Sequence, residues 1–309
     1  MSKLLLVIFM ALGCAAQGRA HAQAQMKTNS QPVPVFSAVG ANEYSFDTGV
    51  LRGKLRAEGR SRGLSSVVYV PTGMRLDSSM GLLSHYRVFS AGKRYGTAAW
   101  DWPGEATLGS DGAVEARWPA ADGRPFELRA RYRWAAPNIL DLETTVLAKT
   151  NLLRFESFLA SYFTADFTNS LVWAAGPDGR RQFIAADKSY GAWLAFPRDE
   201  EAAAIIRDGR WKFEPNPVDW VVMPALAGPL AVRRAPATGL TAVVASPASD
   251  CFAVCTPQQS DPHDSLYLSL FGRDLKEGET ARARVRLLIA PDLSEAEILK
   301  EWAESGSGR

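Results

Sequence analysis

An alternation of apolar and charged residues over Phe126–Trp134 is the feature that most constrains the fold. Every second residue in this stretch is apolar, and the residues between them are Glu127, Arg129, Arg131 and Arg133. A period of two is that of a β-strand with one buried and one solvated face. After the turn at 135–138, residues 139–146 alternate again and residues 155–163 form an apolar run. Three successive strands joined by short turns indicate an antiparallel meander rather than a βαβ unit.

The rest of the chain repeats this pattern of short strands and hairpin turns. Strands are predicted at 95–102 and 210–213, among others, and residues 199–207 favour one or two helical turns. Ser294 and Glu297 form a capping-box pattern that predicts a final helix. The fold class predicted is therefore all-β, a large antiparallel β-supersandwich with a short C-terminal helix, in a single domain over residues 41–305.

The N-terminus has the pattern of an export signal. Lys3 precedes a short apolar run, and small residues at Ala22 and Ala24 suit a signal peptidase. We expect residues 1–24 to be a signal peptide and residues 25–40 a disordered leader; a lipoprotein signal ending at Cys14 is the rival interpretation. No later stretch is long and apolar enough for a membrane span. These observations predict a secreted or periplasmic, soluble protein.

Charge and motifs exclude several function classes. Without residues 1–24, Lys and Arg fall from 35 to 33 against 33 Asp and Glu, so the net charge is near zero. A nucleic-acid partner gains no electrostatic support from that balance. The chain has no glycine-rich phosphate loop after a strand, no GxSxG and no HExxH. No cofactor is expected.

Two cysteines follow the signal segment, Cys251 and Cys255. An oxidising compartment favours a disulfide. Residues four apart in a regular strand are too distant to bridge, so a disulfide needs a loop or bulge here. The sequence leaves the two states open.

The order of elements resembles the galactose mutarotase-like supersandwich family. In that family a strand pair like 131–146 leads to a strand ending His-Pro-Tyr-Phe, which corresponds here to Ala160-Ser161-Tyr162-Phe163. An apolar strand ending Thr-Pro and a Pro-Gly-Glu-Thr-type turn follow, and they correspond to CFAVCTP and KEGET in this chain. The resemblance covers roughly residues 45–290. It implies a supersandwich with a concave sheet face that binds carbohydrate in relatives.

The resemblance also contains two departures. The catalytic His of the family falls on Ala160, and its catalytic Glu falls within Leu268–Phe271, where no acid stands. Mutarotation needs an acid and a base at the sugar. The epimerase activity is therefore not carried over. If the protein is an enzyme, we expect a polysaccharide lyase or a glycoside hydrolase rather than a mutarotase.

His85, Arg87 and Tyr95 are the candidate catalytic residues, with Tyr86 beside them as a substrate-binding residue. Arg87 could pair with the carboxylate of a uronic acid. Tyr95 or His85 could move the α-proton. The alternative is that His85 is a hydrogen-bonded structural residue of a sheet.

Trp100, Asp101 and Trp102 are candidate substrate-binding residues. On a strand the two indoles share one face, where they could stack on sugar rings, and the carboxylate could accept sugar hydroxyls. Alternatively, both indoles belong to the core and Asp101 caps a turn.

Glu156 and Tyr162 complete the predicted binding set. Glu156 interrupts an apolar strand, so it needs a partner or a cleft. With Asp166 it could serve a hydrolytic mechanism; alternatively, it lies on the solvated face paired with an arginine. Asp261, His263 and Asp264 could form a metal site, but such loops are usually solvated turns, and no metal is expected.

Three functions remain open at this stage. The protein could be an exported carbohydrate-binding protein, an exported carbohydrate-active enzyme, or a cell-envelope interaction module without a small ligand. The first predicts partly exposed aromatic rings around a cleft, and the second predicts His85 converging with Arg or Tyr side chains. The third predicts a filled concave face or a large exposed apolar patch.

Overall fold

The computed structural model describes residues 34–306, except for 58–61, 79 and 177. The predicted signal peptide and most of the predicted leader lie outside the described residues. The first strand begins at Ser37, inside the stretch expected to be leader. Its position is explained by Phe36, which is buried and packs edge-on against Phe46.

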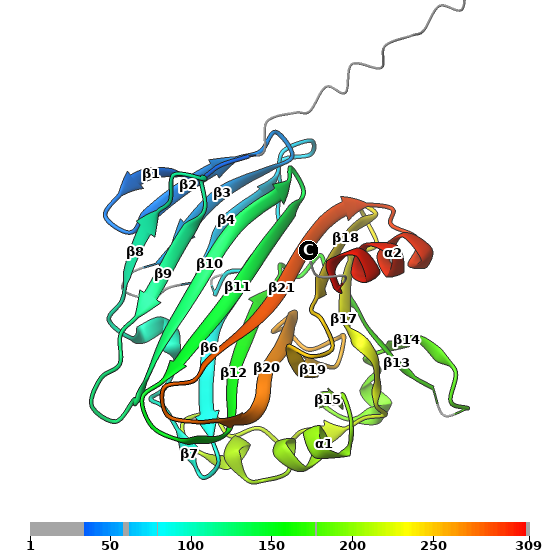
Figure 1. The fold of residues 1–309 in the computed structure, drawn as a ribbon. Coiled ribbons are helices and arrows are strands. Elements are labelled where there is room, and N and C mark those ends of the chain that lie inside the picture. Colours follow the sequence, from blue (N-terminus) through cyan, green and yellow to red (C-terminus); the bar gives the residue numbers. More distant parts are fainter. Residues whose placement is uncertain (1–33, 58–61, 79, 177, 307–309) are drawn as a thin grey trace, which may run out of the picture. The chain divides into compact units, whose positions relative to one another are not determined.

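The described residues form three β-sheets, which confirms the all-β prediction (Figure 1). Every strand pairing is antiparallel except that of β15 with β16. The five-stranded sheet contains, in spatial order, β1 (Ser37–Gly40), β2 (Glu43–Asp47), β3 (Leu51–Arg56), β4 (Gly63–Tyr69) and β5 (Met74–Arg75).

A nine-stranded and a seven-stranded sheet make up most of the fold. The nine-stranded sheet contains, in spatial order, β14 (Arg181–Ala185), β13 (Asn169–Ala175), β17 (Leu226–Ala235), β18 (Leu240–Ala245), β21 (Thr280–Pro291), β11 (Ile139–Ala148), β10 (Phe126–Ala136), β9 (Val114–Trp118) and β8 (Glu105–Leu108). The seven-stranded sheet contains β16 (Val221–Val222), β15 (Trp193–Pro197), β19 (Cys251–Pro257), β20 (Ser265–Leu275), β12 (Leu152–Tyr162), β6 (Ser84–Ser90) and β7 (Lys93–Arg94).

The helices are short. They are α1 (Glu200–Ile206), α2 (Glu295–Gly306) and the 3₁₀ turns η1 (Ala99–Asp101), η2 (Lys188–Tyr190) and η3 (Arg210–Lys212). α2 begins at the predicted capping box, where the Ser294 hydroxyl donates to Glu297 over 2.6 Å. The predicted strand at 210–213 is wrong, because these residues form η3. No helix among the described residues is long and apolar enough to cross a membrane.

The central hairpin is confirmed, but the third strand of the predicted meander lies in another sheet. β10 and β11 pair along their whole length. β12 instead leaves the nine-stranded sheet and pairs with β20 and β6. The turn at 149–151 therefore joins the two large sheets.

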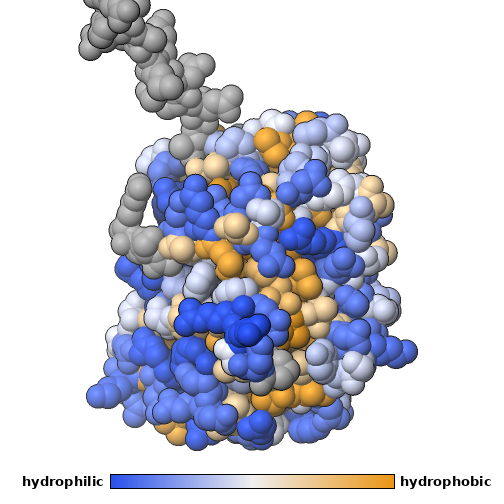
Figure 2. All heavy atoms as spheres, turned by 90° about the vertical axis from the view of Figure 1, so that its right-hand side faces the viewer, coloured by the Kyte–Doolittle hydropathy of each residue, from blue (hydrophilic) through white to orange (hydrophobic). Residues whose placement is uncertain are grey.

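One continuous apolar core fills the space between these sheets and also includes residues of the five-stranded sheet. A second apolar cluster lies on the other side of the seven-stranded sheet, which we call the outer face. The segment 199–223, with α1 and η3, covers this face, and it lies beneath β6, β12 and β20 in Figure 1. Figure 2 shows that apolar residues also form a band between hydrophilic regions on one side of the molecule.

Candidate functional site

The outer face brings together three tyrosines and an arginine from the three adjacent strands β20, β12 and β6. Tyr162 ends β12, and Tyr267 lies opposite Ala160 on β20. Tyr86 and Arg87 lie on β6, the other neighbour of β12. We call these four residues the Tyr–Arg cluster.

The Tyr162 and Tyr267 hydroxyls form a chain. Ser265 donates to the Tyr267 hydroxyl over 2.8 Å, and Tyr267 donates to Tyr162 over 3.5 Å. Burial raises the pKa of Tyr267 to about 12 and raises the pKa of Tyr162 further. Both phenols therefore stay protonated at neutral pH. The Tyr162 hydroxyl can donate a hydrogen bond to a ligand, whereas the Tyr267 hydroxyl donates its hydrogen to Tyr162.

Arg87 is a buried guanidinium without a carboxylate partner. Only 3% of it is exposed. Its Nη2 donates to the Tyr86 hydroxyl over 3.2 Å and to the Asn216 carbonyl over 2.7 Å. Its Nε and Nη1 have no hydrogen-bond partner among the described residues. The guanidinium lies 4.9 Å from the Tyr86 ring centroid and 5.2 Å from that of Trp211, so aromatic faces provide part of its stabilisation.

Arg94 lies near Arg87 and holds the same loop. It donates to the carbonyls of Phe213, Pro215 and Thr97. Burial, and next the positive charge of Arg87, lower the pKa of Arg94. The loop 213–220 is thus attached to β6 and β7 by two arginines through backbone carbonyls.

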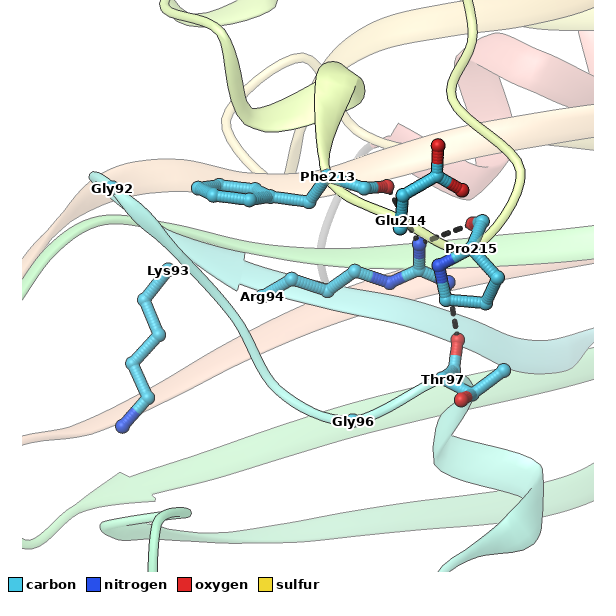
Figure 3. A pocket seen from close by; sticks show the side chains of 8 residues that line it. All are labelled: Gly92, Lys93, Arg94, Gly96, Thr97, Phe213, Glu214 and Pro215. Atoms are coloured by element: carbon cyan, nitrogen blue, oxygen red, sulfur yellow. Dashed lines mark hydrogen bonds between the residues drawn. The ribbon is translucent and has the colours of Figure 1, made fainter.

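A shallow pocket of about 400 Å³ opens beside Arg94. It is lined by Gly92, Lys93, Arg94, Gly96, Thr97, Phe213, Glu214 and Pro215. In Figure 3 the Arg94 guanidinium lies between the loop and Thr97, and the Glu214 carboxylate points away from it. Among the described residues, the hydrogen bonds of Arg87 and Arg94 go to backbone carbonyls and one hydroxyl rather than to carboxylates. The charge of Glu214 nevertheless acts to raise the pKa of Arg94, against the effects of burial and of Arg87.

Partly exposed aromatic rings surround the Tyr–Arg cluster. Tyr86 stacks on Trp100 with ring centroids 4.4 Å apart and planes 2° apart. On the other side, Trp220 packs edge-on against Trp193 at 5.8 Å, and Trp193 contacts the His263 ring at 5.1 Å. Tyr86, Trp193 and Trp220 are all partly exposed, so their rings are accessible at the edges of the cluster.

His85 points to the opposite side of the sheet from Arg87. A regular strand would place residues 85 and 87 on one face. In β6, however, Tyr86 and Arg87 together lie opposite Phe158, since Val88 pairs with Ser157 and His85 with Leu159. This bulge adds one residue and turns Arg87 to the outer face.

His85 is enclosed in the core between the sheets. Its Nε2 hydrogen-bonds with the Thr144 hydroxyl at 2.9 Å, and Trp118 lies against its ring. Burial lowers the pKa of His85 to about 3, so it is neutral at physiological pH. Tyr95 is buried in the same core, where its hydroxyl bonds with Ser90 at 2.8 Å. The structure thus separates His85 and Tyr95 from Arg87.

The predicted strand at 95–102 is wrong, and the two tryptophans diverge. Residues 99–101 form η1, so Trp100 joins the outer-face cluster, whereas Trp102 joins the core. Trp102 packs under the Arg124 guanidinium, 4.2 Å from the ring centroid. Asp101 is exposed on the η1 turn.

Glu156 is fully buried and bonded to an arginine. Its Oε2 accepts from Arg210 Nη1 over 2.9 Å, and its Oε1 accepts from Ser269 over 2.9 Å. Arg210 also pairs with Asp208 at 2.8 Å. Burial lowers the pKa of Arg210, but Glu156 and Asp208 outweigh that effect and raise it. Asp166, the proposed partner of Glu156, is exposed and bonds with Thr164.

The cysteines and the 261–264 loop have separate environments. Cys251 and Cys255 are both free and buried. They lie in different clusters, Cys251 in the core and Cys255 on the outer face. His263 bonds with Asp261, whereas Asp264 pairs with Arg233. No group of three or more His, Cys, Asp or Glu side chains in the described part of the chain is placed to hold a metal.

Comparison with known proteins finds similar structures but no related sequence. No protein-family model matches the sequence, and no curated protein matches it. The structure is similar to that of the Slr1438 protein from Synechocystis sp. PCC 6803, with a TM-score of 0.50 and 15% identity over 85% of this chain and 99% of that one. It is also similar to a galactose mutarotase related enzyme from Lactobacillus acidophilus, with a TM-score of 0.49 and 11% identity over 82% and 99%.

A further similar structure is galactose 1-epimerase from Lactobacillus acidophilus NCFM, with a TM-score of 0.46 and 11% identity over 81% of this chain and 95% of that one. The chain therefore shares the fold of the Slr1438 protein. At these identities the likeness concerns the fold alone.

Four residues of the site escaped the sequence analysis: Arg94, Trp193, Trp220 and Tyr267. Tyr267 had a usable signal, because it alternates with Leu266 and Leu268 and so points away from the core. The other three lie on short or irregular elements, where no periodicity marks an inward or outward side.

Proposed function

We propose that the protein is exported and binds a carbohydrate at the Tyr–Arg cluster on the outer face of the seven-stranded sheet. The observation that carries this proposal is the combination of the unpartnered N–H groups of Arg87 with phenol hydroxyls and partly exposed aromatic rings. Sugars present hydroxyls at their edges and C–H groups on their faces. Polar groups fix the orientation of such a ligand, and aromatic faces supply the apolar contact.

Binding without turnover is the form of this function that the geometry favours. Glu156 is occupied by Arg210 and Ser269, and His85 lies on the other side of the sheet. Neither can reach a ligand at the Tyr–Arg cluster in this arrangement. Export rests on the sequence pattern of residues 1–24 and on no structural observation.

The proposal can be tested by titrating the purified protein with neutral and acidic oligosaccharides in a calorimeter. We expect binding that Trp220→Ala weakens, because the indole edge is removed from the cluster. Trp173→Ala is the control, since Trp173 is also a partly buried tryptophan in an aromatic contact, with Phe183, but it lies in the nine-stranded sheet. Equal loss in both variants, or binding in neither the wild type nor the control, would contradict the proposal.

The alternative is an interaction module of the cell envelope. The apolar band in Figure 2 is the observation that favours it, because extended apolar surface marks sites of protein association. The alternative is supported if the protein binds none of the sugars but self-associates or binds a component of the cell envelope.

A further inference from the structure

The Arg87–Arg94 pair indicates what kind of carbohydrate the outer face would bind. This inference rests on the proposed function, since it names the class of ligand for the same site. Both guanidiniums are attached to the 213–220 loop through neutral backbone carbonyls. Arg87 is buried and Arg94 is partly exposed, and of the acids near them Glu214 acts on Arg94 by its charge alone. Two like charges near each other are unfavourable, and an anion between them would offset that cost.

The unsatisfied donors of Arg87 have a geometry that suits an oxyanion. A guanidinium has two edges that can bind a carboxylate with two hydrogen bonds. Nη2 belongs to both edges, paired with Nε on one and with Nη1 on the other. Because Nε and Nη1 are both without partners, release of the Asn216 carbonyl from Nη2 would leave one complete two-donor edge free.

The 213–220 loop is suited to such a release. Residues 213–217 and 219 are exposed, so their carbonyls can bond to water when they leave the arginines. Val218 remains bonded to Trp211, which would keep the end of the loop in place. The pocket beside Arg94 already opens between this loop and the β6–β7 turn (Figure 3).

We propose that the site takes an anionic sugar, whose carboxylate or sulfate group replaces the Asn216 carbonyl on Arg87 while Arg94 contributes a second positive charge. The sugar ring then lies beside the partly exposed edges of Tyr86 and Trp220, since the Tyr86 ring faces are covered by Trp100 and Arg87. No covalent step is involved. The 213–220 loop acts as a strap that is held closed by the same arginine that binds the ligand.

The test is a comparison of matched neutral and anionic oligosaccharides by titration calorimetry. A trigalacturonate, a neutral galactose trisaccharide and a sulfated galactose trisaccharide would serve as probes at low and at high salt. We expect an anionic probe to bind about tenfold or more tightly than the neutral one, with the difference shrinking as salt rises. The uronate and sulfate arms separate the two sources of the negative charge.

Variants assign the preference to Arg87. Arg87→Gln is expected to abolish the preference for the anionic probe, so that the variant binds the neutral and the anionic probe equally and both more weakly than the wild type does. Arg87→Lys keeps the charge but loses the two-donor edge, so it should retain part of the preference. Arg282→Gln is the matched control, because Arg282 is exposed on β21 and its loss changes the net charge equally.

Each outcome decides between the proposals. Equal binding of neutral and anionic probes would overturn the anionic-sugar inference and leave the carbohydrate function standing. No binding of any probe would overturn both. If Arg87→Gln does not fold, the preference of the wild type for the anionic probe and its salt dependence still test the inference. Hydrogen exchange of the 213–220 amides is a further test, because it should accelerate when the anionic probe releases the loop from Arg87.

Discussion

Two buried arginines on the outer face are stabilised in opposite ways. Arg210, in η3 of the segment 199–223 that covers this face, is matched by the carboxylates of Glu156 and Asp208. Arg87, on β6 beneath the same segment, has one hydroxyl, one backbone carbonyl and two aromatic faces. A guanidinium paired with acids has no capacity left for a ligand, whereas one with unpartnered donors has that capacity. The first arrangement is that of a structural anchor and the second that of a binding group.

The largest effect is expected at the Glu156–Arg210 anchor. Glu156→Ala leaves the Arg210 charge buried with only Asp208 as an acidic partner, so the free energy of unfolding should fall by about 3 to 5 kcal/mol. Urea denaturation followed by circular dichroism measures this loss. Ser269→Ala is the comparison variant, because it removes one hydrogen bond to the Glu156 carboxylate but keeps the ion pair, so it should cost less, about 1.5 to 3 kcal/mol. A loss below about 1 kcal/mol for Glu156→Ala would remove the distinction between the two arginines.

The next largest effect is the pH dependence of stability that His85 causes on the core side of β6. His85 has a folded-state pKa of about 3, below its ordinary value of 6.5. Between these values the unfolded chain binds a proton that the folded chain does not, so stability is complete above pH 6.5 and falls as the pH drops. The slope contributed by one such group is about 1.4 kcal/mol per pH unit.

The pH dependence of unfolding can be assigned to His85 with two variants. His85→Gln should remove this part of the slope between pH 4 and 6.5. His263→Gln should retain it, because His263 is exposed and bonds with Asp261 on the surface. Identical slopes in wild type and His85→Gln would contradict the burial of a neutral imidazole between the sheets.

A smaller effect on stability is expected at α1, the part of the covering segment that precedes Arg210. Asp199 caps α1 by accepting a hydrogen bond from the Ala202 amide over 2.8 Å. Asp199→Ala should therefore cost about 1 kcal/mol, and Asp199→Ser should restore most of it because serine also caps helices. Hydrogen exchange of the 200–206 amides measures the change locally. If Asp199→Ala protects the 200–206 amides as well as the wild type does, the cap is dispensable and Arg210 alone holds the segment.

The sequence predicts the strands of this fold better than their partners. The alternation over Phe126–Trp134 identified β10, and its hairpin with β11 follows from the turn. The alternation gave no sign that β12 pairs in the other sheet, because periodicity marks which face of a strand is buried and not which strand lies beside it. Similarly, the need of Glu156 for a partner was predictable, but Arg210 lies 54 residues away.

The candidate site was only partly predictable for a related reason. Arg87 was selected for its chemistry and lies on the outer face, but the expected companion His85 does not. One extra residue in β6 reverses the alternation between them, and a bulge has no signature in the sequence of a single strand. The sequence does not reveal the loop that contacts Arg87 and Arg94 either, because these contacts are made by backbone carbonyls that any residue could supply.

The smallest effect on stability is expected at Arg87 itself, and it completes the comparison with Arg210. Arg87→Gln removes a buried charge that no acid balances, and it leaves no carboxylate without a partner. The Asn216 carbonyl that it frees is in an exposed residue and can bond to water. The free energy of unfolding should therefore change by less than about 1 kcal/mol, in contrast to the large loss for Glu156→Ala. If urea denaturation instead gives equal losses for the two variants, Arg87 is a second anchor of the covering segment, and its unpartnered donors are a cost of the fold rather than the means of recognising a ligand.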